Sequence, residues 1–172
     1  MYLTNDDAHV SLEALEAWMS QYEGPLADKK KSRAANRALI TIMRAAPDDV
    51  VARLLDLASI VDAQNSGKFP LGEAARYGRA AAVQTLLARG CDPNLESDQP
   101  PIHQEGEEGY RPLLLAIEGG HAECVRLLLD AGADASLPTH KGSSPVQFAQ
   151  EKGDAAVIAV LEKGGAAPRD ES

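Results

Sequence analysis

The chain has 172 residues, of which 44% are hydrophobic and 25% are charged, a composition typical of a globular protein that excludes fibrous and wholly disordered classes. Seventeen basic against 26 acidic residues leave a formal net charge of −9. This charge argues against nucleic-acid binding, because phosphate contacts require clustered Lys and Arg, and it favours association with a basic protein.

The N-terminal segment is predicted to form one amphipathic helix. Ser11 is a suitable N-cap, and Gly24–Pro25 ends a helix that we expect to run to Tyr22. The apolar residues of this helix step by three and four positions and therefore share one face: Leu12, Leu15, Met19 and Tyr22. Two interpretations stay open, a lid over the helices that follow and a detachable helix that binds a partner.

Residues 38–58 align with residues 112–132 further along the chain. Ala38 stands where the later segment has proline, and the apolar positions match at Val50, Val51, Leu54 and Leu55. Ala38 also precedes Pro70 by 32 residues, which is close to the spacing of the later segments. We interpret residues 33–65 as a degenerate N-terminal repeat, because terminal repeats are expected to be atypical.

Three further segments repeat one pattern, at residues 69–94, 111–136 and 144–166. Each carries a proline near its start: Pro70, Pro112 and Pro145. The second spacing between these prolines is 33 residues and the first is 42, which leaves nine extra residues between the first two segments. A fixed period of this length is the signature of stacked structural repeats.

Each segment is predicted to form a pair of helices. Proline suits the first turn of a helix, since its missing N–H would have no partner there. Glycines then stand where the first helix ends, at Gly78, Gly120 and Gly153, and where the second ends, at Gly90, Gly132 and Gly164. The second helices carry apolar triplets: Val83, Leu86 and Leu87; Val125, Leu128 and Leu129; Val157, Val160 and Leu161. One pair cannot bury its apolar sides alone, so neighbouring pairs must stack.

These segments resemble the ankyrin-repeat family. The matching residues are the turns Pro70–Leu71 and Pro112–Leu113, the Gly120–His121 pair and the Gly132–Asp134 loop start. The resemblance covers about residues 66–166 and implies an all-α ankyrin-repeat solenoid. The family's threonine before proline is replaced by Phe69, Arg111 and Ser144, and its histidine after Pro-Leu by Gly72, Leu114 and Gln147. Because that pair ties neighbouring turns in the family, we expect a less regular array.

The resemblance implies a division of the chain into seven parts. They are an N-terminal helix and linker (1–32), a degenerate capping repeat (33–65), an ankyrin repeat (66–98), an acidic finger (99–108), a second ankyrin repeat (109–141), a C-terminal capping repeat (142–166) and a tail (167–172). The nine extra residues fall inside residues 96–110, a stretch with five acidic residues and no Lys or Arg. Such a loop is interpreted either as a partner contact or as a tolerated insertion.

Ankyrin arrays resemble a cupped hand, with the loops between repeats as fingers and the exposed side of the first helices as the palm. The positions that match these surfaces are the candidate partner-binding residues: Lys68, Arg76, Tyr77, Glu105, Glu107, Glu108, Tyr110, Glu118, His140 and Lys141. Tyr77 and Tyr110 are expected to be exposed, as binding hot spots or as ordinary packing against a finger.

Motifs for catalysis, metals and cofactors are not found. No pair of cysteines or histidines has zinc-ligand spacing, and neither a phosphate-binding glycine loop nor a nucleophile elbow occurs. His121 is expected to be structural and Cys124 to lie in the core. We therefore expect no enzyme, no cofactor and no metal site.

The expected location is the cytoplasm. The chain has only two cysteines, Cys91 and Cys124, and so no disulfide framework. Its first residues lack a signal-peptide pattern, and no apolar stretch is long enough to span a membrane.

The sequence thus predicts a non-enzymatic module, monomeric when free, that binds and occludes or scaffolds a protein partner. No nucleic acid and no membrane is expected among its partners. Two alternatives remain, an immunity-type inhibitor of a basic bacterial toxin and a structural subunit that self-assembles.

Overall fold

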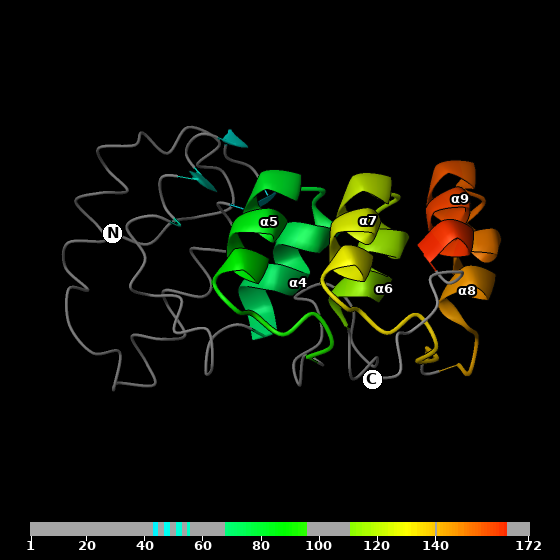
Figure 1. Cartoon of the computed structure of the whole chain (residues 1–172). Coiled ribbons are helices and arrows are strands. Elements are labelled where there is room, and N and C mark those ends of the chain that lie inside the picture. The colour runs from blue at the N-terminus through cyan, green and yellow to red at the C-terminus, as the bar shows by residue number, and fades with distance from the viewer. Residues whose placement is uncertain are drawn as a thin grey trace.

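The structure is a computed structural model that describes residues 43, 44, 47, 48, 51, 52, 55, 68–95, 111–139 and 141–164. The described residues 43, 44, 48, 51, 52 and 55 are helical, and six helices lie in residues 68–164 of this part (Figure 1). Their bounds are α4 Lys68–Arg76, α5 Ala80–Ala88, α6 Pro112–Glu118, α7 Ala122–Asp130, α8 Pro145–Lys152 and α9 Ala155–Gly164. Every element described is therefore an α-helix, as expected for an all-α solenoid.

The helices form two layers. The first helices α4, α6 and α8 pack side by side in one layer, and the second helices α5, α7 and α9 pack in the other. Each first helix also packs against the second helix that follows it. Figure 1 shows the three pairs standing in a row. This is the stacking that the repeat period predicts, and it places the ends of α4 and α6 next to one another.

The repeat prolines lie in the first turns of their helices. Pro112 and Pro145 start α6 and α8, whereas α4 begins at Lys68, two residues before Pro70. All three positions are tolerated because the first N–H groups of a helix have no intrahelical partner.

The N-terminus of α8 is stabilised by a capping box. The Ser144 side chain accepts from the Gln147 N–H at 3.2 Å, and the Gln147 side chain accepts from the Ser144 N–H at 2.8 Å. These two residues replace the threonine and histidine of the family pattern. The reciprocal cap that they form satisfies two of the N–H groups that a helix end leaves unpaired.

Glycines reverse the chain between the helices of a pair. Gly78 and Gly120 have φ of +69° and +72°, a left-handed conformation that side chains with a Cβ rarely adopt. The next N–H group then bonds back into the first helix, from Arg79 to Ala74 at 2.8 Å and from His121 to Ala116 at 2.9 Å. The predicted ends of the first helices are therefore confirmed.

The core lies between the two layers and runs through all three pairs. The second helices bury the positions that the apolar pattern predicts, with Leu87, Leu129 and Val160 partly exposed at the edge. The first helices add small residues, among them Ala74, Ala75, Ala116 and Ala149, each 0% exposed. Three residues of the predicted degenerate repeat join the same core: Met43, Val51 and Leu55.

Polar side chains tie neighbouring units together. Arg79 donates from Nε to the Met43 carbonyl at 2.8 Å and from a terminal nitrogen to Asp48 at 2.7 Å. Arg89 donates to the Leu55 carbonyl. Within the repeat of residues 109–141, Arg111 donates to the Pro138 carbonyl at 3.1 Å. Arg79 and Arg89 thus link α5 to the residues before α4, because a long guanidinium side chain reaches backbone carbonyls of the adjacent unit.

Four predicted segments lie wholly or largely outside the described residues. These are the helix and linker of 1–32, most of the degenerate repeat of 33–65, the acidic finger of 99–108 and the tail of 167–172. Their structures remain predictions.

Candidate partner-binding surface

The structure describes the side chains of four of the ten candidate residues: Arg76, Tyr77, Glu118 and Lys141. Lys68 is the first residue of α4, but its side chain is outside the described part. Five candidates also lie outside the described residues: Glu105, Glu107, Glu108, Tyr110 and His140.

Arg76 and Glu118 end the neighbouring helices α4 and α6. One terminal nitrogen of Arg76 lies 3.7 Å from Oε2 of Glu118, and the two side chains are only 18% and 19% exposed. This distance makes an ion pair but exceeds that of a hydrogen bond. Glu118 Oε2 is buried and has no hydrogen-bond donor among the described residues. The side chains of Arg76 and Glu118 are therefore less exposed than was expected for residues on the palm surface.

Tyr77 follows α4 directly and packs partly buried against the core. Tyr77 is therefore less exposed than predicted, because its ring packs against the core of the stacked repeats. Burial is the largest cause that raises the pKa of its hydroxyl, and the carboxylate of Glu73 raises it further. The positive charges of Arg76 and Arg44 act in the opposite direction. Tyr77 thus lies within electrostatic reach of all three groups.

Glu73 is a buried acid that sequence analysis did not single out. It lies in α4, is 6% exposed and takes the place that Leu115 and Phe148 occupy in the other two units. Burial raises the pKa of its carboxyl, and the nearby Arg76 offsets part of this rise. The gapless alignment of the repeats could have revealed Glu73. In that alignment Glu73 occupies a position that is apolar in the other two units.

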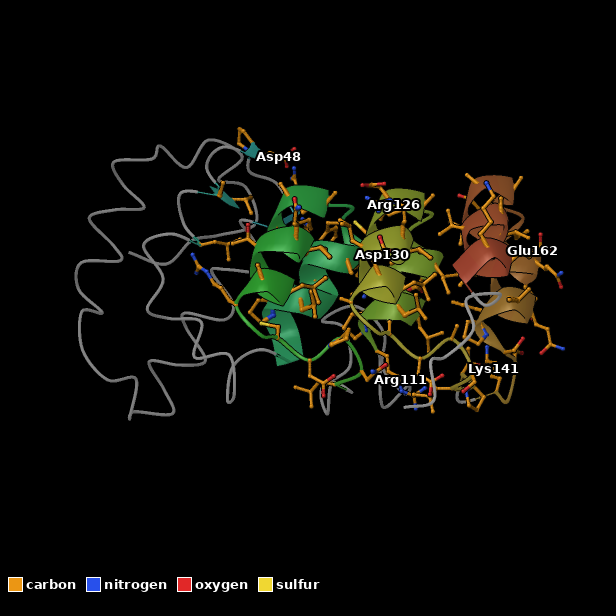
Figure 2. The ribbon with its side chains drawn as sticks, viewed as in Figure 1. Asp48, Arg111, Arg126, Asp130, Lys141 and Glu162 are labelled. Atoms are coloured by element: carbon orange, nitrogen blue, oxygen red, sulfur yellow. The ribbon has the colours of Figure 1, made fainter. Side chains whose placement is uncertain are left out.

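Lys141 lies apart from this group. It precedes α8, whereas Arg76 and Glu118 end their helices, so the length of a first helix, roughly 10 to 12 Å, separates them. Figure 2 labels Lys141 and Arg111 along the same lower edge of the row of helix pairs. The structure therefore pairs Arg76 with Glu118, keeps Glu73 and Tyr77 within electrostatic reach of Arg76, and places Lys141 in the loop before α8.

No group of three metal-ligating side chains occurs within the described residues. The two cysteines are buried, as predicted for Cys124, and their thiols are free. The ring of His121 packs where a Cβ would stand at Gly78 or Gly119, which fits a structural role. Among the helices that the structure describes, none has the length and apolarity needed to cross a membrane.

Comparison with known families finds two matches. A model described as "Ankyrin repeat" matches residues 66–98, and a model described as "Ankyrin repeats (many copies)" matches residues 95–149. The matched region contains α4 to α7 and reaches into α8.

Several similar proteins are named as ankyrin-repeat proteins. The human ankyrin repeat domain-containing protein 63 is 32% identical over 136 residues, 75% of this chain and 33% of that protein. The human ankyrin repeat and SOCS box protein 3 is 34% identical over 98 residues, 56% of this chain and 18% of that protein. The ankyrin repeat, SAM and basic leucine zipper domain-containing protein 1 of Atelerix albiventris is 29% identical over 161 residues, 90% of this chain and 31% of that protein. The chain thus spans a third or less of the length of these relatives.

Proposed function

Since the chain belongs to the ankyrin-repeat family, whose repeats generally mediate protein–protein interaction, we propose that it is a non-enzymatic module that binds one protein partner. The observation that carries this proposal is the ion pair between Arg76 and Glu118, which joins the ends of α4 and α6 and has the partly buried Tyr77 and the buried Glu73 near Arg76 on the chain. We call this group the palm cluster: Glu73, Arg76, Tyr77 and Glu118.

The palm cluster has the composition of an interface centre. Tyrosine and arginine are enriched among residues that dominate binding energy, and partial burial holds them in place before the partner arrives. Arg76 and Glu118 are held by their ion pair, and Tyr77 by its packing on the core. The partner would be occluded or scaffolded by contacts that spread from this cluster to the fingers.

The charge of the chain supports a basic partner. The net charge of −9 raises the encounter rate with a positively charged protein, and salt would reduce this effect. The acidic finger would contribute Glu105, Glu107 and Glu108, beside Tyr110 and His140. A more specific version of this proposal is that the chain inhibits a basic bacterial toxin.

Capture experiments with the full chain test the proposal. Lysate of the source organism is passed over the wild-type chain and over the variants Tyr77→Ala and Arg126→Ala, at low and at high salt. Arg126 is the matched control, because it lies on the second helix α7 and pairs only with Glu123 and Asp130 among the described residues. We expect a protein that the wild type and Arg126→Ala retain at low salt and that Tyr77→Ala releases.

Equal capture by Tyr77→Ala and the wild type would contradict binding through the palm cluster. Circular dichroism of both variants establishes that they are folded. Light scattering after size-exclusion chromatography should show a monomer, whereas a stable oligomer would favour the self-assembly alternative.

A further inference from the structure

We draw no further inference here: the strongest candidate, the outer face of the last helix pair α8 and α9, where Val146 and Ile158 are partly exposed although their equivalents Leu71 and Val83 are 0% exposed, is an unpartnered apolar face, and nothing in the structure shows what covers it.

Discussion

The side-chain amide of Asn94 donates a hydrogen bond to the carbonyl oxygen of Gly132, 38 residues further along the chain, at 2.9 Å. Its Oδ1 accepts from the backbone N–H of Asp134 at 2.7 Å. One side chain thus satisfies a donor and an acceptor in the loop of the next unit. Among the residues that the structure describes, the equivalent side chain of that unit, Ser136, bonds to Asp134 in its own loop.

Replacement of Asn94 should weaken the stack. In Asn94→Ala the half-buried N–H of Asp134 loses its acceptor from the neighbouring unit, which should cost about 1 to 3 kcal/mol of unfolding free energy. Urea denaturation followed by circular dichroism measures this loss. The control is Ser136→Ala, which removes no contact between units. Equal destabilisation by the two variants would argue that the bridge contributes nothing.

Replacement of Gly119 by alanine should destabilise the fold, although the φ of Gly119, −78°, is one that alanine adopts readily. A Cβ there would stand 2.5 Å from the backbone oxygen of Arg76, and backbone cannot move away cheaply. We expect a destabilisation of about 1 to 3 kcal/mol, which outweighs a gain in helix propensity of at most about 1 kcal/mol.

Gly164→Ala is the matched comparison for this prediction. The nearest obstacle there is Cδ1 of Leu129 at 2.6 Å, the end of a flexible side chain. This variant should therefore unfold at nearly the wild-type urea concentration. A Gly119→Ala variant as stable as Gly164→Ala would show that α4 and α6 can separate without cost.

Glu73 should make stability depend on pH. Burial raises the pKa of its carboxyl in the folded state above the unfolded value, so ionisation opposes folding. The penalty is absent below the unfolded pKa, develops as pH rises through the folded pKa and is complete above it. Glu73→Gln should therefore be more stable than the wild type at pH 7.5, with the difference vanishing near about pH 4.

Urea midpoints at both pH values test this dependence on Glu73. Glu162→Gln is the control, since that carboxylate is exposed, and it should shift neither midpoint appreciably. A Glu73→Gln variant less stable than the wild type at pH 7.5 would mean that the folded chain favours the charged form.

The thiol of Cys124 should be nearly unreactive in the folded chain. Burial and, to a smaller extent, the negative charge of Glu123 raise the pKa of the Cys124 thiol to about 11. The thiolate fraction, and with it the rate of alkylation by iodoacetamide, should climb about tenfold per pH unit from pH 7 to 9 without levelling off. Mass spectrometry of the Cys124 peptide follows this rate. A plateau below pH 9, or an equal rate in urea, would contradict the prediction.

Local features of the sequence were sufficient to predict the helix pairs. Proline and glycine restrict the backbone at their own positions, so Pro112, Pro145, Gly78 and Gly120 mark helix ends whatever surrounds them. The repeated apolar pattern then predicted the buried faces of α5, α7 and α9, because a helix that repeats its pattern also repeats its packing.

The palm cluster depended instead on how the units stack. Sequence alignment placed Arg76 and Glu118 at equivalent positions, but only the packing of α4 on α6 brings them to 3.7 Å and encloses both. Tyr77 is partly buried against the core, and Glu73 is buried. The sequence by itself therefore determined the period, the helices and the core. The tertiary structure decided which side chains meet at the palm, because burial and pairing depend on the distance between neighbouring units, which no single repeat contains.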